Sequence, residues 1–385
     1  MLDRATVPTI DFAVTVHRAL PEDWPGIAGM GAVRGHVFQT REFLDVWLRS
    51  LGSGPHVEPC FVDVTGSDGQ IVIRLPLAIE TRGGLRTLGF ADQSAADYNA
   101  PLVYPNDIAW TPALAAALWR AVEAALPAVD RVLLDKVPAL VGDRVNPVWF
   151  VADAPNAESA HGSDLTRPWP EIEATQAQLK TLKRKARGLE KLGPVTFTVA
   201  ADAAARERIL TRLLAQKQRR FEDTHVPGFA ESPMSRRFYE LATGVFAASG
   251  NLHLAALSVG DEIIATSWTV SLGTTIYETM IGFEAGEWAK HSGGRILNLR
   301  FLEWARARGF TYLDHGIGDE DWKLENCDTH VQLGRLEIAR TAAGRRAMAG
   351  ARLKRRLTET PLYQKLRPYK WIVKRALKAR LRRTA

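Results

Sequence analysis

The fold follows from one run of the sequence, TTIYETMIGFEAGEWAKHSGGRILNLRFLEWARARGFTYLDHGIGDEDWK, at positions 274–323. Residues 274–283 are rich in β-branched and aromatic side chains and contain no proline, which predicts a strand. Residues 295–308 place apolar side chains at helical spacing and are followed by Gly309, which predicts a helix that ends at a glycine. Residues 311–313 predict a second, short strand. The run therefore predicts a strand, a turn, a helix and a strand in succession.

The turn in this unit ends in Ser292, Gly293 and Gly294, directly before the predicted helix. Two glycines at the start of a helix let backbone N–H groups approach a phosphate, and the helix dipole favours its negative charge there. An ordinary strand-to-helix connection that binds nothing fits the same residues. The local sequence therefore indicates an anion site and leaves the plain turn as its alternative.

Size and composition indicate a globular protein. The chain has 385 residues, of which 46% are hydrophobic, and this is enough for two cores. Its cysteines, Cys60 and Cys327, are too few and too far apart in sequence to predict a disulfide framework or a zinc cluster. The sequence has no apolar run of about 18 residues, and Asp3 and Asp11 argue against a secretory signal. We therefore expect a cytoplasmic protein.

Positive charge is concentrated at the C-terminal end. Residues 345–385 contain fifteen Lys or Arg and one acidic residue, a net charge of +14; because the whole chain carries +7, residues 1–344 carry −7. Apolar residues recur there at helical intervals, which predicts a basic amphipathic helix suited to an anionic membrane surface. Nucleic acid and the acidic body of the protein are the alternative partners. We expect peripheral contact with the inner face of a membrane.

The first 150 residues predict a mixed layer of strands and helices, with Thr40 as the N-cap of the first helix. A loop rich in Asp, Ser, Tyr and Asn covers residues 91–105, and the polar, proline-containing residues 152–170 predict a linker. The predicted elements are a helix at 40–48, strands at 58–63, 71–79 and 85–90, a helix at 111–126 and a strand at 131–136.

The second half begins with a strongly basic segment at residues 176–193, QAQLKTLKRKARGLEKLG. Its apolar residues form one narrow seam, so the segment is either a solvated helix or a basic wall that attracts a phosphorylated ligand. Short connections between the later strands predict an antiparallel meander that leads into the opening unit. The predicted elements are strands at 195–199, 252–257, 262–272 and 274–283 and helices at 203–221 and 232–249.

The second half resembles the GNAT superfamily of acyl-CoA-dependent acyltransferases, and within it the BioF2-like, or CelD (BcsL)-type, acetyltransferases linked to cellulose biosynthesis. The resemblance covers residues 165–340 and rests on the basic run 179–187, on SGGRIL at 292–297 and on DHGIGDEDWK at 314–323. The last block is similar to the family pattern D-x-x-x-G-D-E-x-Y-K, with Trp322 in place of the usual tyrosine.

This resemblance implies an α/β (α+β) fold with two tandem GNAT-like layers, as in the FemAB-type peptidoglycan aminoacyltransferases. Each layer is expected to be a mixed, largely antiparallel sheet flanked by helices. The expected boundaries are residues 1–155 for a degenerate N-terminal half without a cofactor loop, 165–344 for the acyltransferase domain and 345–385 for the basic tail.

Acyl transfer from a thioester needs a bound acyl-CoA, a base for the nucleophile and polarisation of the thioester carbonyl. We expect acetyl-CoA or another acyl-CoA as co-substrate and no metal. Ser292, Gly293 and Gly294 are predicted to hold the CoA pyrophosphate, and Arg295 to add positive charge. Transfer of this kind needs no covalent enzyme intermediate, so Cys327 is expected to be structural.

The candidate base lies among the ionisable residues at the end of the unit. Asp314 and Asp319 are favoured, on condition that burial or a neighbouring carboxylate raises the pKa, over His315, whose ordinary pKa is already suitable. A turn in which these carboxylates only cap backbone N–H groups is the alternative.

Three further residues are candidates for substrate contact. Lys323 would anchor an acidic substrate or neutralise the acidic cluster around it. Tyr277 and Glu278, on the last strand of the meander, would face the acceptor channel or simply pack within the sheet.

Together these features favour an N- or O-acyltransferase for a small-molecule or saccharide acceptor in polysaccharide, cellulose or cell-envelope metabolism. One alternative is a FemAB-like aminoacyl transferase that uses aminoacyl-tRNA, the only case in which nucleic acid would be a partner. The other is a non-catalytic accessory protein of exopolysaccharide synthesis.

Overall fold

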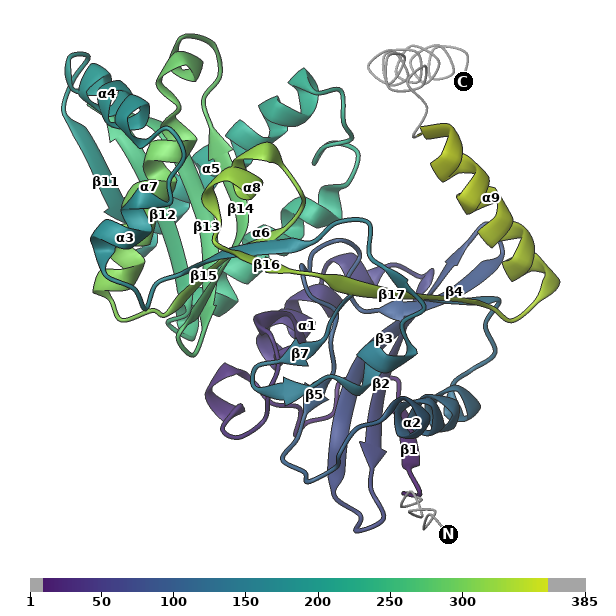
Figure 1. Ribbon diagram of the computed structural model, residues 1–385. Helices are drawn as coiled ribbons and strands as arrows, with labels where there is room; N and C mark the ends of the chain where they lie inside the picture. Colours follow the sequence, from purple (N-terminus) through teal and green to yellow (C-terminus); the bar gives the residue numbers. More distant parts are fainter. Residues whose placement is uncertain (1–9, 359–385) are drawn as a thin grey trace, which may run out of the picture.

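The computed structural model describes residues 10–358, which form two large β-sheets with helices on their faces (Figure 1). The first half of the chain, in purple and blue, and the second half, in teal and green, lie side by side. Helix α9 (Ala342–Thr358) projects away from both halves. The predicted α/β class, with mixed sheets flanked by helices, is confirmed.

The first sheet is antiparallel except for one parallel pair within it. After β4, helix α2 returns the chain so that β6 pairs parallel with β4. Helix α2 begins at Pro112 because Thr111 accepts a hydrogen bond from the N–H of Leu114, an N-cap followed by proline at the first helical position. The sheet comprises β1 (Ala13–His17), β2 (Val57–Thr65), β3 (Ile71–Arg82), β4 (Leu85–Phe90), β6 (Arg131–Pro138), β17 (Leu333–Ala339) and β9 (Ala154–Pro155), in that order, and β5 (Leu102–Val103) pairs with β3.

The second sheet repeats this plan. Strands β12 to β14 form the predicted antiparallel meander, β11 pairs antiparallel with β12, and helix α7 then returns the chain so that β15 pairs parallel with β14. The predicted succession of strand, turn, helix and strand is therefore present. The sheet comprises β11 (Val195–Val199), β12 (Leu252–Val259), β13 (Glu262–Leu272), β14 (Thr275–Phe283), β15 (Tyr312–Ile317), β10 (Ala160–Asp164) and β16 (Thr329–Val331), in that order.

Helices cover both faces of the second sheet because the strands of the meander are buried on both sides. On one face, Leu182 and Phe301 pack with Ile276 in a single hydrophobic cluster. On the other, Leu213 and Phe246 belong to a cluster that continues into the first half. The main helices are α1 (Arg41–Leu48), α2 (Pro112–Ala125), α3 (Trp169–Ala174), α4 (Leu179–Glu190), α5 (Ala203–Asp223), α6 (Pro233–Ala248), α7 (Gly293–Ala307) and α8 (Asp321–Asn326).

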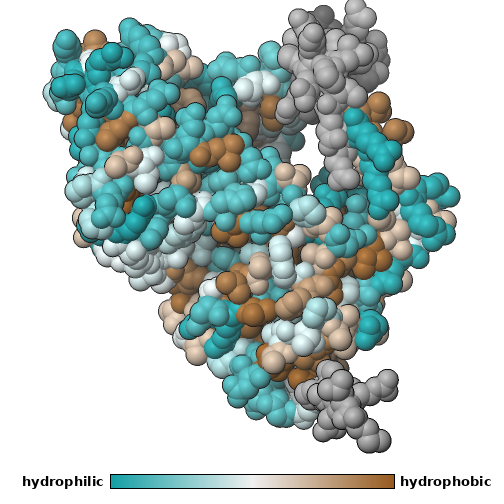
Figure 2. Space-filling view, viewed as in Figure 1, coloured by the Kyte–Doolittle hydropathy of each residue, from teal (hydrophilic) through white to brown (hydrophobic). Residues whose placement is uncertain are grey.

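Several short elements complete the two halves. Strands β7 (Leu140–Val141) and β8 (Arg144–Val145) form a separate two-stranded sheet. The 3-10 helices are η1 (Ile27–Gly29), η2 (Val37–Gln39), η3 (Leu51–Ser53), η4 (Pro147–Val151) and η5 (Gly286–His291). In the space-filling view, hydrophobic residues gather where the two halves meet and over the first half, while the second half presents a mostly hydrophilic face (Figure 2).

The halves are joined by two crossings of the chain. Residues 152–170 do not form a plain linker, so that prediction is wrong in part: they contain β9 in the first sheet and β10 in the second. The sequence of β10, AHGSD, lacks the hydrophobic alternation that identifies a strand. Gly162 is required there, because a Cβ would lie 2.1 Å from the hydroxyl oxygen of Tyr312. The second crossing runs from β16 to β17 (Figure 1).

The predicted C-terminal helix falls only partly within the described residues. Helix α9 covers residues 342–358, whereas residues 359–385, with most of the predicted apolar positions of the tail, lie outside the part that the structure describes, as do residues 1–9. Within residues 10–358, no helix combines the length and apolar character needed to cross a membrane.

Candidate active site

Strands β14 and β15 part after a short paired region. Their parallel register includes Thr275 with Tyr312 and ends with Tyr277 opposite Asp314. Beyond that pair, β14 continues to Phe283 and β15 continues for three more residues without further pairing between them. A bulge in the pairing of β13 with β14 lies at the same level. The sheet therefore opens at Tyr277 and Asp314.

A pocket of about 1000 Å³ lies beside this opening, where the two halves meet. Both halves line it: His36 and Tyr98 come from the first, and Tyr277, Tyr312 and Asp314 come from the second. A volume of this order is typical of sites for small molecules. The pocket is therefore large enough for a small acceptor substrate. It lies at the junction of the two halves, and neither half forms it alone.

Asp314 has the environment expected of a general base. Its side chain is buried, with 3% of the residue exposed. Its Oδ2 accepts a hydrogen bond from the hydroxyl of Tyr98 at 2.5 Å, and its Oδ1 accepts one from the N–H of Gly316 at 2.7 Å. Burial raises the pKa of Asp314 to about 7, against the opposing effect of the Tyr98 hydrogen bond. A carboxyl group with a pKa near neutrality can both take up and release a proton at physiological pH.

A second carboxyl group from the first half lies next to Asp314. Asp97 accepts a hydrogen bond from the N–H of Ile317 at 3.3 Å, and burial raises the pKa of Asp97 to about 6. Gly316 has a φ of +72°, and a Cβ at this position would lie 2.7 Å from a carboxylate oxygen of Asp97. Glycine is therefore required where the loop of the first half meets β15. The proximity of Asp97 also raises the pKa of Asp314, since two like charges disfavour each other.

Three ring side chains of the pocket wall, His36, Tyr98 and Tyr277, are uncharged at neutral pH. The ring of His36 stacks on Tyr98 with 4.4 Å between centroids, and its Nδ1 lies 3.3 Å from the hydroxyl of Tyr277. Burial lowers the pKa of His36 to about 4, so the imidazole is neutral. Burial also raises the pKa of both tyrosine hydroxyls, which stay protonated. These groups can exchange hydrogen bonds with a hydroxyl or amine acceptor.

Glu278 and His315 face each other across the opened strands. The Glu278 carboxylate lies 2.9 Å from Nδ1 of His315, and their side chains are 4% and 1% exposed. The His315 ring also lies edge-on to Trp322, with 5.3 Å between centroids. Neither residue lines the large pocket. Of the residues predicted to contact the acceptor, Tyr277 therefore reaches the pocket wall, whereas Glu278 lies with His315 inside the sheet opening.

Asp319 lies in a different environment from Asp314. Its side chain is 40% exposed, and its Oδ1 lies 2.8 Å from Nε2 of His161. That hydrogen bond lowers the pKa of Asp319. A carboxylate of lowered pKa is a poor proton acceptor at neutral pH, so between the two favoured carboxylates the structure supports Asp314.

Lys323 is buried and engaged at the end of β15. Its ammonium donates to the carbonyl oxygen of Ile317 at 2.8 Å and forms an ion pair with Glu320 at 3.1 Å. It therefore holds the loop that follows β15 and pairs with an acidic neighbour.

The glycine turn lies at the other end of β14 from the pocket. Ser292 has a left-handed conformation, with a φ of +57°, and helix α7 begins at Gly293. A Cβ on Gly294 would lie 3.1 Å from the ring of Phe283, the last residue of β14. Both glycines thus belong to the first turn of a 15-residue helix, where N–H groups have no partner within the helix. Such N–H groups are available to an anion.

Two basic residues adjoin this turn. Lys185 of α4 donates a hydrogen bond to the Ser292 hydroxyl at 2.7 Å, so the basic helix lies beside the turn. Other basic residues of α4, such as Lys180 and Arg184, are exposed. Arg295, predicted to add charge to a cofactor site, donates to the side-chain oxygen of Asn326 at 2.9 Å and so also fastens α7 to the end of α8.

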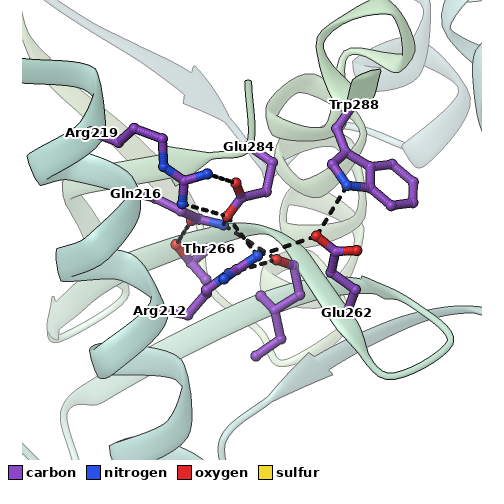
Figure 3. Close-up of polar contacts among 8 residues, drawn as sticks. Arg212, Gln216, Arg219, Glu262, Thr266, Glu284 and Trp288 are labelled. Carbon is purple, nitrogen blue, oxygen red and sulfur yellow. Dashed lines mark hydrogen bonds and ion pairs between the residues drawn. The ribbon is translucent and has the colours of Figure 1, made fainter. Parts of the chain in front are cut away.

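A buried ion network fixes the start of the segment that carries the turn. Arg212, Gln216 and Arg219 reach from α5 toward Glu284, the residue that follows β14 (Figure 3). Glu284 is 4% exposed, lies 2.9 Å from Arg212, pairs with Arg219 and accepts a hydrogen bond from Gln216 at 3.0 Å. Glu284 is the buried member of the network, so its carboxylate would be left uncompensated if both partly exposed arginines were removed. The network therefore anchors the loop from β14 to α7 on the neighbouring helix.

Several residues of this site carry no local sequence signal. His36 and Tyr98 come from the first half and line the pocket, and Asp97 from the same half reaches β15, only because the halves pack together. The one indication in the sequence is the polar loop at residues 91–105, which stands out between apolar strands. That loop supplies both Asp97 and Tyr98.

Comparison with known proteins agrees with this geometry. Residues 176–324 match the family model described as an acetyltransferase (GNAT) domain, a range that includes the meander, the glycine turn and β15. No curated protein matches the sequence.

Three solved structures align with most of this chain. FemX has a TM-score of 0.53 at 11% identity, over 80% of this chain and 92% of FemX. A tandem GNAT protein from the clavulanic acid biosynthesis pathway has a TM-score of 0.45 at 14% identity, over 86% and 98% of the two chains. L-PGS from Bacillus licheniformis has a TM-score of 0.43 at 13% identity, over 78% and 92%. Of the three, FemX alone is similar enough to bear on the fold, and at this identity it bears on nothing further. Residues 176–324 therefore carry a GNAT acetyltransferase domain, and the chain as a whole has a fold similar to that of FemX.

Proposed function

We propose that this protein transfers an acyl group from acetyl-CoA to an amine or hydroxyl group of a small acceptor bound in the pocket between the two halves. The observation that carries the proposal is the position of Asp314, which combines a pKa near neutrality with a place on the pocket wall at the point where β14 and β15 part. Asp314 is thus the proposed base, lines the proposed acceptor pocket and lies where the sheet opens.

The donor is proposed to enter from the end of the sheet that carries the glycine turn. Ser292, Gly293 and Gly294 start helix α7, and its unpaired N–H groups and dipole favour the CoA pyrophosphate. Lys185 lies against Ser292 and adds positive charge from α4. This end is about 20 Å from Tyr277, since six residues of β14 at ~3.3 Å each separate it from Phe283. An extended thioester arm between the parted strands would span that distance.

The thioester carbonyl would then lie near the N–H groups that β14 no longer shares with β15. Backbone donors aimed at this oxygen stabilise the charge that develops on it as the acceptor attacks. The acceptor nitrogen or oxygen forms a bond to the carbonyl carbon, the carbon–sulfur bond breaks, and CoA leaves as its thiolate. The proton that the acceptor loses passes to Asp314 and can return to the thiolate, so the products are the acylated acceptor and CoA.

The acceptor is proposed to be a saccharide or another small polar molecule of cell-envelope or polysaccharide metabolism, cellulose included. Hydroxyl and imidazole groups of the pocket wall, among them Tyr98, Tyr277 and His36, are suited to bind sugar hydroxyls. We propose that residues 165–344 form the CoA site and that residues 1–155 form one wall of the acceptor pocket. Residues 345–385 are proposed to hold the enzyme at an anionic membrane surface.

The test is release of CoA thiol from acetyl-CoA in the presence of a panel of acceptors that includes glucosamine, neutral sugars and simple amines. We expect thiol release that depends on both the protein and one acceptor class, with the acylated product detected by mass spectrometry. Absence of acetyl-CoA binding in calorimetry would overturn the proposal. Binding without transfer to any acceptor would instead favour a non-catalytic accessory role in exopolysaccharide synthesis.

The second candidate is an aminoacyl transferase that uses aminoacyl-tRNA. The fold similarity to FemX and the exposed basic residues of α4 and α9 support it. This candidate predicts retention of tRNA on purification and no affinity for acetyl-CoA, so the same calorimetric experiment separates it from the first.

A further inference from the structure

Two histidines and one aspartate from three separate segments meet where the chain crosses between the halves. His161 on β10 and His330 on β16 are directly opposite in the antiparallel register of these strands. Asp319 follows β15, and its Oδ1 lies 2.8 Å from Nε2 of His161. One ligand atom from each of the three side chains lies within 4.8 Å of the others.

This set of donor atoms matches the preference of a particular class of metal ion. Two imidazole nitrogens and one carboxylate oxygen are typical ligands of divalent zinc, which binds them at about 2.0–2.2 Å and keeps one further position for water. His161 is buried and lies on β10, which pairs with β15 on one side and β16 on the other, whereas Asp319 and His330 are exposed, so an ion can reach them from solvent. We propose that His161, Asp319 and His330 bind one Zn²⁺ ion.

The proposed ion would connect three segments near the two crossings of the chain between the halves. Strand β10 directly follows the first crossing between the halves, and β16 directly precedes the second, as the neighbouring ribbons in Figure 1 show. Asp319 belongs to the loop that continues into α8. A Zn²⁺ ion bound to all three segments therefore fastens both crossings to the loop after β15. Because His330 also lines the large pocket, the ion would fix one part of the pocket wall.

The alternative is a simple hydrogen bond between His161 and Asp319. Zinc binding and a simple hydrogen bond differ in whether they need His330 and in whether they need a charged carboxylate at position 319. A hydrogen bond survives replacement of Asp319 by Asn, whose amide oxygen still accepts, whereas zinc coordination requires the charged carboxylate. A hydrogen bond between His161 and Asp319 also makes no use of His330. The wide separation of the three positions in sequence explains why no metal was expected from ligand spacing.

The experiment uses the untagged full-length chain, stripped with a chelator and then titrated with Zn²⁺ in calorimetry, with elemental analysis of the bound metal. The variants are His330→Ala, Asp319→Asn and, as a control, His56→Ala, a half-exposed histidine of the first half that pairs with Glu80 instead. Thermal unfolding with and without Zn²⁺ provides a second readout that does not involve catalysis.

We expect one Zn²⁺ per chain, a rise in Tm with Zn²⁺, and affinity at least about tenfold weaker in His330→Ala and in Asp319→Asn but unchanged in His56→Ala. Both variants alter exposed side chains, so circular dichroism should show an intact fold. Equal zinc affinity in all four proteins, or no binding by the native chain, would overturn the proposal. The result is independent of acyl transfer, since the readouts are metal content, affinity and Tm.

Discussion

Replacement of Asp314 by Asn should stabilise the folded protein at alkaline pH while removing the proposed base. The buried carboxyl of Asp314 has a pKa raised from 3.8 to about 7, so the folded state holds its proton over a range in which the unfolded chain has lost it. Below pH 3.8 the carboxyl is protonated in both states. As the pH rises toward 7, the native protein progressively loses stability from this group, because ionisation is unfavourable in the buried site.

The size of the stability change follows from the pKa shift of Asp314. A displacement of roughly three pH units corresponds to about 4 kcal/mol at about 1.4 kcal/mol per unit. An Asn at this position never ionises, so the variant does not lose folding stability as the pH rises. Its amide oxygen can accept from the N–H of Gly316, and its N–H₂ can donate to the Tyr98 hydroxyl, which can turn to accept. The gain of Asp314→Asn should therefore grow from almost nothing at pH 4 to about 4 kcal/mol above pH 8.

The assay is thermal unfolding of both proteins from pH 4 to pH 8.5, with circular dichroism as the signal. The expected difference in Tm rises with pH and reaches on the order of 8 °C. Asp164→Asn is the matched control, since hydrogen bonds from Thr166 lower the pKa of Asp164. Its contribution to stability is present above the unfolded pKa and disappears in acid, so the control should lose stability at neutral pH.

The pH dependence decides the result. A stability difference for Asp314→Asn that stays constant across the pH range, or a variant that is less stable than the native protein at pH 8, would show that the Asp314 carboxyl does not carry a raised pKa. The acid–base assignment of the site would then be wrong.

Three further predictions concern the donor site, the base and the tail. Tyr98→Phe removes the hydrogen bond that lowers the pKa of Asp314, so the pH–rate profile should move upward by about one unit, and an unmoved profile would exclude Tyr98 from tuning the base. Gly294→Glu should abolish acetyl-CoA binding in calorimetry, whereas Gly244→Glu, at a helix position with open space around a Cβ, should leave it intact; equal affinities would remove the turn from the CoA site. The full chain should float with vesicles that contain anionic lipid and a chain without residues 345–385 should not, and identical flotation would end the proposal of a membrane contact.

Local signals were sufficient to predict the central part of the second half. The meander, the turn and helix α7 follow from hydrophobic periodicity and from glycine positions, and their observed bounds, Thr275–Phe283 for β14 and Gly293–Ala307 for α7, differ from the prediction by at most two residues. These features depend on residues close together in the sequence.

Contacts between distant parts of the chain were not predictable in the same way. The prediction that Asp314 acts as base required a raised pKa, and the burial that raises it comes from packing of the first half, including Tyr98, 216 positions away in the chain. Strand β10 is too polar to show alternation, and its pairing depends on β15 and β16, which lie far along the chain. A single sequence gives no signal for such long-range pairings. It does identify the ionisable side chains that can act once those pairings bring them together.

The central claim is that acyl transfer takes place where Asp314 faces the pocket between the halves. The most direct measurement compares the native protein with Asp314→Asn for acetyl-CoA affinity in calorimetry and for turnover with the best acceptor. The structure predicts unchanged affinity, because the glycine turn lies at the other end of β14, and turnover lower by at least about a hundredfold, the usual contribution of a general base. Turnover at the native rate in Asp314→Asn would contradict the account.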